Sequence, residues 1–223
     1  MKAVLAVAVA ALLFPLSALK ADTFEGTFTV KLSPWGRQAT GVLKVSAKPD
    51  LMRLDLQSAR GEVSTIIDLK NRQLLTLMPQ AHMYMVRSLP ERLSSGTQAS
   101  AAFGSLVEAG GAEKILGYAC TKYIVDGPEG RAEVWVTNEL GEYPGLFKWV
   151  GPTGQGVAQS WETALRGRNF FPLRVVRKNS SNGVTFHVDV TDVRKGDLPD
   201  SLFAAPEGWR KYSLDGAFPG IGR

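Results

Sequence analysis

Apolar and polar residues alternate along the chain from residue 23 to residue 87. Leu43 and Val45 alternate with Lys44 and Ser46, and the same period of two recurs in the neighbouring runs. This period predicts β-strands with one buried and one solvated face, and the short connections between the runs are typical of hairpins. A succession of strands without a helix excludes an alternating strand–helix fold and predicts an antiparallel sheet. The expected strands are 23–32, 39–47, 51–56, 62–69, 72–78 and 82–87.

The second half of the chain continues this sheet. Its expected strands are 113–118, 120–126, 131–137, 170–178 and 183–193, which brings the total to about eleven. The last two strands are expected to form a hairpin across the turn sequence NSSNG. The sheet is expected either to close into a barrel or to curl around other elements.

Two short helices and one irregular segment interrupt the strands. A helix is expected within 94–111, where Phe103, Leu106 and Val107 belong to an apolar stripe, and another within 138–150, beginning at Pro144. The glycine-rich segment 151–167 is expected to be irregular, with Trp161 packed. No repeat or linker divides the chain, so residues 22–223 are predicted to form one mainly β domain.

The N-terminus has the three-part layout of a secretory signal peptide. Lys2 precedes an apolar run over 3–14, and small residues lead to an expected cleavage after Ala21, or else after Ala18. A membrane anchor or a core helix is the alternative, although the run is short for a membrane span. We therefore expect residues 1–21 to be removed and the mature protein to be periplasmic, without a transmembrane segment. No cysteine lies near the cleavage site, so no lipid anchor is expected.

The charge of the chain limits its possible binding partners, and its cysteine content limits its possible disulfides. The formal net charge is +5, and the two lysines within 1–21 account for two of these charges, which leaves about +3. The basic residues are dispersed and do not interleave with aromatic residues, so nucleic acid is not an expected partner. Cys120 is the single cysteine, which excludes an internal disulfide, and it is interpreted as a small buried hydrophobe.

Candidate catalytic and metal sites are weak. His187 and Asp189 share one strand face and are expected to lie close together, but no serine stands in a nucleophile motif, and a solvated face is the simpler interpretation. His82 with Met83 and Met85 could suggest copper, yet these side chains alternate between two faces and favour packing. No catalytic residue, cofactor or metal is predicted.

Several strands carry apolar residues on both faces. The run at 73–78 contains Leu74, Leu75, Leu77 and Met78, and the run at 82–87 is similar. A sheet with one face in water does not require this pattern. Either short helices cover the second face, or the curled sheet encloses a hydrophobic cavity lined in part by adaptable methionines.

These runs resemble the outer-membrane lipoprotein carrier (LolA-like) fold and, more closely, a related family of exported domains of unknown function. The resemblance rests on FEGTFTVKL, on Lys48-Pro49 before an acidic strand, on the hairpin IIDLKNRQLLTLMP, and on the ending DLPDSLFAAPEGWRKY. GYACTKY and AEVWVTNELG are similar to the relatives of unknown function. The resemblance implies an antiparallel half-barrel that holds acyl chains under a helical lid. The carriers place an arginine before the proline to hold the lid shut, whereas this chain has Lys48.

The sequence therefore predicts a non-enzymatic periplasmic protein that binds a lipid, an acyl chain or a lipidated partner in a hydrophobic concavity. The alternative is an envelope protein-interaction or sensor module whose cavity is filled by its own side chains and whose sheet edge pairs with a protein partner. The expected lining residues are Phe28, Leu43, Leu54, Leu75, Leu77, Met83, Met85 and Trp135, and the expected lid residues are Phe103, Leu106, Phe147 and Trp149.

Overall fold

The structure is a computed structural model, and it describes residues 23–33, 40–58, 61–89, 105–149 and 159–212. The expected signal peptide, 1–21, and the expected lid residue Phe103 lie outside these ranges. Within them, no helix is both long enough and apolar enough to cross a membrane.

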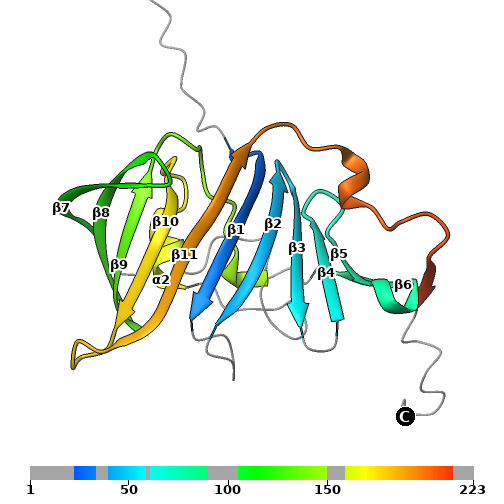
Figure 1. The fold of residues 1–223 in the computed structure, drawn as a ribbon, viewed down its shortest axis with the longest axis horizontal. Coiled ribbons are helices and arrows are strands. Elements are labelled where there is room, and N and C mark those ends of the chain that lie inside the picture. Colours follow the sequence, from blue (N-terminus) through cyan, green and yellow to red (C-terminus); the bar gives the residue numbers. More distant parts are fainter. Residues whose placement is uncertain (1–22, 34–39, 59–60, 90–104, 150–158, 213–223) are drawn as a thin grey trace, which may run out of the picture.

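The described residues form one open, twelve-stranded sheet (Figure 1). Its order is β12-β6-β5-β4-β3-β2-β1-β11-β10-β9-β8-β7, and every pairing is antiparallel except that of β12 with β6. The strands are β1 Gly26–Ser33, β2 Gly41–Lys48, β3 Leu51–Ser58, β4 Gly61–Asp68, β5 Gln73–Met78, β6 Met83–Ser88, β7 Leu106–Ile115, β8 Tyr118–Gly127, β9 Gly130–Thr137, β10 Phe171–Lys178, β11 Val184–Lys195 and β12 Arg210–Tyr212. The predicted mainly β, incomplete barrel is confirmed, with the short strand β12 in addition to the eleven expected.

The hairpin turns follow the sequence signals. Between β10 and β11, Asn179 N–H donates to the carbonyl of Gly183, and Asn182 takes a left-handed conformation with φ 65°. Between β2 and β3, Asp50 also takes a left-handed conformation, with φ 63°. Asparagine and aspartate tolerate this conformation better than most residues, so these turns suit their sequences.

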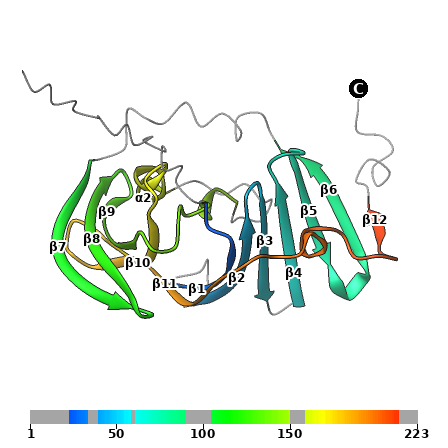
Figure 2. The same ribbon diagram turned by 90° about the horizontal axis from the view of Figure 1, so that it is seen from above.

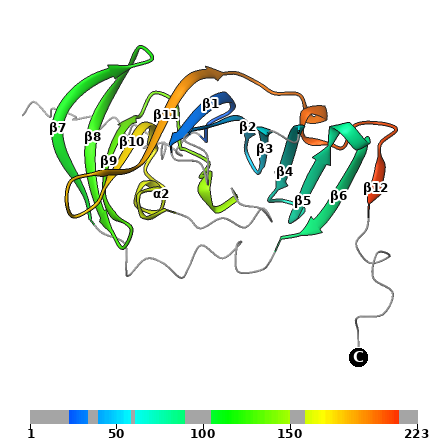
Figure 3. The same cartoon turned by 60° about the horizontal axis from the view of Figure 1, so that its bottom comes forward.

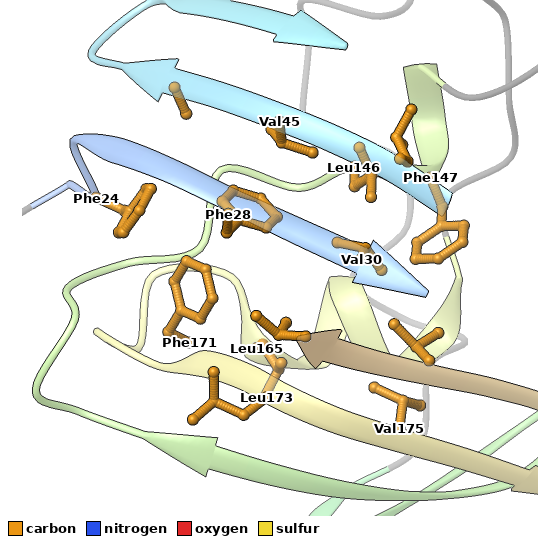
Figure 4. Packing of buried hydrophobic residues seen from close by; sticks show 14 of the residues in the cluster. Phe24, Phe28, Val30, Val45, Leu146, Phe147, Leu165, Phe171, Leu173 and Val175 are labelled. Carbon is orange, nitrogen blue, oxygen red and sulfur yellow. The ribbon is translucent and has the colours of Figure 1, made fainter. Parts of the chain in front are cut away.

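The inner, concave face of the sheet carries the main core. Phe24, Phe28 and Phe171 pack with ring centroids 4.9 to 5.5 Å apart. Figure 4 shows them beside Leu146 and Leu165, which come from segments that cover this face. These covering segments are 138–149, which contains the 3-10 helix η2 (Phe147–Trp149), and helix α2 (Ser160–Leu165). Figure 2 shows the sheet curling around α2.

The outer face of β4 and β5 has a second, smaller core. Ile66 and Leu77 pack there with Phe203, which belongs to the 3-10 helix η3 (Asp200–Phe203). Residues 197–209, which we call the C-terminal strap, run along this face after β11 (Figure 3). Arg53 donates from Nη1 to the carbonyl of Leu202 at 3.1 Å, which fastens the strap to β3.

Two sequence expectations for helices need correction. Leu106 and Val107 are the first residues of β7 and pair with Val125 and Ile124 of β8, so the helix predicted across them is wrong. These residues form a strand because β8 provides a cross-strand partner for them. Gly110 and Gly111, which were interpreted as a helix stop, lie instead at an irregularity of β7.

The second helical prediction was misplaced along the chain. In 138–150 only the three residues of η2 are described as helical, whereas the segment expected to be irregular contains α2. Trp161 and Leu165 stand four residues apart on α2, which places both against the core. The packing of Trp161 is confirmed, and so is the burial of Cys120.

Candidate functional site

One cleft of ≈ 310 Å³ lies where the covering segments meet the ends of β2, β3 and β4. Its volume is close to the lower limit of about 300 Å³ for small-molecule sites. The lining residues come from the N-terminal end of the described chain, from the β2–β3 turn, from β3 and β4, and from the cover: Thr23, Lys48, Pro49, Asp50, Leu51, Met52, Ile67, Leu69, Glu142, Tyr143, Pro144, Gly145, Glu162, Leu165 and Arg166.

The cleft has two apolar walls. Met52 of β3 and Ile67 of β4 are buried on the sheet side, and Leu165 of α2 is buried on the cover side. Met52 and Ile67 are register partners, and Ile67 is also paired with Leu74, so these three sheet residues share the concave face. An apolar group between the two walls would lose contact with water on both sides.

Glu162 is a buried carboxylate at the cover side of the cleft. Its Oε1 accepts the backbone N–H of Leu146 at 2.7 Å and that of Phe147 at 3.0 Å. The Tyr143 hydroxyl lies near this carboxylate, and each group shifts the pKa of the other. Burial raises the pKa of Glu162 above its ordinary value, while the N–H donors act in the opposite direction. Glu162 therefore fastens the irregular segment at 142–147 to α2.

Tyr143 responds to the same surroundings. Burial and the neighbouring Glu162 carboxylate raise the pKa of its phenol well above the ordinary value, so it stays protonated and remains a donor. Sequence reasoning missed both residues. The signal was present in the sequence WETAL, where an acid stands between Trp161 and Leu165, but the segment was interpreted as irregular.

The charged groups Lys48 and Glu142 at the mouth of the cleft contact different parts of the chain. Lys48 Nζ lies 2.7 Å from Asp200 Oδ1 and 3.3 Å from the carbonyl of Leu198, so it holds the C-terminal strap. Its pKa is raised, chiefly by the hydrogen bond to Asp200. Glu142 Oε1 accepts the N–H of Gly167 at 2.7 Å, beyond the end of α2.

Lys48 occupies the place at which the resemblance implied a latch for the lid. In this structure its partners lie on the outer face, in the C-terminal strap, and not in the cover of the concave face. Lys48 therefore fastens the chain after β11 to the end of β2, beside the cleft.

The predicted lining residues do not share one face. Phe28, Leu43 and Leu54 are buried in the inner core. Leu75 and Leu77 belong to the outer cluster, so their placement in the same wall was wrong. Their strand alternates with a period of two, and Leu74, not Leu75, is the register partner of the inward-facing Ile67.

The remaining predicted residues are placed as follows. Met83 and Met85 are half-buried, and they alternate with Tyr84, which packs in the outer cluster, so they face the concave side. Trp135 lies between Lys122 and Arg174, whose charged groups stand 5.2 and 5.7 Å from the ring centroids. It alternates with the buried Val134 and Val136 and faces outward, so its assignment to the concave wall was wrong.

The predicted lid residues are part of the core or of a strand. Phe147 and Trp149 are buried against the concave face, and Leu106 belongs to β7. Of the twelve residues predicted to bind, the eleven that the structure describes are absent from the lining of the cleft. Those that the structure describes hold the walls in place or lie elsewhere on the sheet.

His187 and Asp189 do lie close together on β11, as predicted. The Nε2 of His187 is 3.1 Å from Asp189 Oδ2, and Arg174 Nε is 3.1 Å from the other carboxylate oxygen. Arg174 also reaches Glu113 at 2.8 Å. These residues form a row of polar contacts, which includes the ion pairs of Arg174, across the outer face of the sheet and away from the cleft.

Metal-binding groups are not gathered in the described ranges. No set of three or more His, Cys, Asp or Glu side chains there has an arrangement that could hold a metal ion. His82, considered with Met83 and Met85 as a copper ligand, instead packs its ring edge-on to Trp209 with centroids 5.8 Å apart.

Comparison with known proteins identifies a family without an assigned role. A family model described as a domain of unknown function, DUF4412, matches residues 24–209. The resemblance to a family of domains of unknown function, predicted from the sequence, is thereby confirmed. No curated protein matches the sequence.

Several solved structures are similar in fold. An uncharacterized conserved protein from Thermus thermophilus is 11% identical, with a TM-score of 0.48 over 84% of this chain and 90% of that chain. The MucA/MucB complex of Pseudomonas aeruginosa gives 12% identity and a TM-score of 0.43 over 81% of this chain and 55% of that chain. A third similar structure is a putative outer membrane lipoprotein-sorting protein domain from Vibrio parahaemolyticus, the class named in the sequence resemblance. It is 10% identical, with a TM-score of 0.31 over 80% of this chain and 87% of that chain. The chain spans 31% of the length of another similar structure, PNGF-II.

Proposed function

This chain belongs to the DUF4412 family, whose function is unknown, and we propose that it is a non-enzymatic periplasmic protein that binds one apolar group of a lipid, an acyl chain or a lipidated partner. The cleft between the sheet and its cover is the observation that carries this proposal. Met52 and Ile67 supply one wall, and Leu165 supplies the other. Phe28, Leu43 and Leu54 support the sheet wall from within the core.

The size and lining of the cleft favour an apolar ligand of modest bulk. Two buried walls remove the ligand from water, and methionine adapts its shape to different chains. The volume is too near the lower end of ligand sites for a bulky, multi-chain lipid to enter whole. One chain, or the end of one, is the occupant that we propose.

The test is a filling variant with a matched control. Leu69 lines the cleft and is 40% exposed, whereas Val63 on β4 is 38% exposed and is not part of the lining. We expect Leu69→Trp to lower the uptake of a fluorescent fatty acid at least tenfold, and Val63→Trp to leave it unchanged. The purified protein should also release lipid into an organic extract analysed by mass spectrometry. Absence of lipid in the extract, together with no uptake by the unmodified protein, would sink the proposal.

A second candidate is a protein-interaction module. It is favoured by the burial of Leu146, Phe147 and Trp149, because these side chains of the protein itself fill much of the concave face. It is also favoured by β7, an edge strand of ten residues that pairs only with β8 within the described part of the sheet. Recovery of one stoichiometric protein from an envelope extract, without lipid, would support this candidate over lipid binding.

A further inference from the structure

The charges at the mouth of the cleft are divided between its two walls. Asp50 belongs to the β2–β3 turn on the sheet side, and Arg166 follows α2 on the cover side. Both side chains are exposed. Neither makes a side-chain hydrogen bond or ion pair with any residue in the described ranges.

The other charged residues of the cleft are already engaged. Lys48 is held by Asp200, and Glu162 accepts the backbone N–H groups of Leu146 and Phe147. Glu142 is held through one oxygen by Gly167. Among its described lining residues, the cleft therefore offers one uncommitted cation and one uncommitted anion, above an apolar interior.

We propose that the ligand is a single-chain amphiphile with a zwitterionic head, whose negative group binds Arg166 and whose ammonium binds Asp50. This inference rests on the proposed function, because it assigns the head of the ligand whose chain lies between Met52, Ile67 and Leu165. A purely anionic head would meet like charge at Asp50 and Glu142, and a purely cationic head would meet like charge at Arg166. A head that carries both charges satisfies each wall.

The chemistry of the two side chains suits these roles. The guanidinium of arginine presents parallel N–H donors that match the oxygens of a phosphate. A carboxylate accepts hydrogen bonds from an ammonium group. The volume of ≈ 310 Å³, near the lower end of ligand sites, favours a ligand with one chain over a ligand with two.

The experiment compares ligands that have different head groups and the same acyl-chain length. Lysophosphatidylethanolamine, lysophosphatidylglycerol and the corresponding fatty acid are titrated into the protein below their micelle concentrations, with binding measured by calorimetry. We expect the zwitterionic probe to bind roughly five- to tenfold more tightly than either anionic probe, since each exposed charge contributes modestly to binding.

Two variants separate the two charges. Arg166→Gln should lower the affinity for the zwitterionic probe by about fivefold, and it should also lower the affinity for lysophosphatidylglycerol. Asp50→Asn should lower the affinity for the zwitterionic probe alone. This variant should fold normally, because asparagine accepts the left-handed backbone of the turn, φ 63°. Arg168→Gln and Asp126→Asn, exposed changes outside the cleft, are the matched controls and should leave all affinities unchanged.

The outcomes distinguish this inference from the proposed function. Equal affinity for all three probes, tighter binding of an anionic probe, or unchanged affinity in both cleft variants would overturn the recognition of the head and leave apolar binding standing. No binding of any probe would overturn both.

Discussion

Glu162 offers the sharpest test of how the cover is held over the concave face. Its Oε1 accepts the N–H groups of Leu146 and Phe147 at 2.7 and 3.0 Å, in a segment that has no strand partner for these donors. In Glu162→Ala both donors lose their acceptor. A buried donor left unpaired costs about 1–3 kcal/mol, so the two cost about 2–6 kcal/mol of unfolding free energy. That is a large share of the roughly 5–15 kcal/mol that stabilises a typical domain.

Glu162→Gln should behave differently, because its amide oxygen can still accept both N–H groups. We expect it to stay within about 1 kcal/mol of the unmodified protein at neutral pH. It also removes the titration of the carboxyl. Burial raises the pKa of Glu162 in the folded protein, so the folded state holds this proton more tightly than the unfolded state. The stability that this group contributes is therefore present below the ordinary glutamate pKa and is lost as the pH rises through the raised pKa.

The measurement is urea unfolding followed by tryptophan fluorescence, at several pH values from acidic to neutral. Trp149 and Trp161 are buried on the concave face and report on the cover. Relative to Glu162→Gln, the unmodified protein should lose stability across this range as the pH rises. Glu142→Gln, the same change of carboxyl to amide at a residue that accepts one N–H donor, is the control for the cost of the substitution at neutral pH. Identical slopes for the unmodified protein and Glu162→Gln, or a cost below about 1 kcal/mol for Glu162→Ala, would refute the assigned role of this carboxylate.

Three further predictions concern the fold that carries the cleft. Phe28→Ala should cost about 3–5 kcal/mol in urea unfolding, because Phe28 is buried among aromatic rings, whereas Val42→Ala at a position 53% exposed should change stability by less than about 0.5 kcal/mol. Gly26→Ala should strongly destabilise the protein, since a Cβ on this residue, at φ 143°, would collide with the carbonyl oxygen of Arg194, and a melting temperature equal to that of the unmodified protein would contradict this. Phe203→Ala should cost about 3–5 kcal/mol and increase proteolysis within the C-terminal strap, while unchanged cleavage would show that the strap is held without its aromatic anchor.

Local patterns were sufficient to predict most of the sheet. A period of two identifies a strand from its own residues, and turn sequences such as NSSNG fix the neighbouring pairings. These signals are contained in short segments, which is why most strands were found within a few residues. β12 was missed because three residues are too few to show a period, and its pairing with β6 joins segments that are distant in sequence.

The cleft could not be predicted in the same way. It is formed by the β2–β3 turn, the ends of β2, β3 and β4, and cover residues that come much later in the chain, within 142–145 and 162–166. Alternation shows that a strand has an apolar face, but it does not show which elements cover that face. Leu43 and Leu54, predicted as lining residues, belong to the inner core together with Leu146 and Trp149, which come from the cover.

The apolar load on both faces of β5 decides between the two explanations that the sequence left open. Leu74 packs in the inner core with Ile67, whereas Leu77 packs in the outer cluster with Ile66 and Phe203. Each face of this strand is thus covered by a different part of the same chain, so the doubly apolar pattern reflects a second cover and not a cavity. The cleft lies instead at the ends of the strands, where residues of the inner cover and of the β2–β3 turn line it together. A search for binding residues in such half-barrels should therefore begin at the turns that border the cover, and not along the most apolar strands.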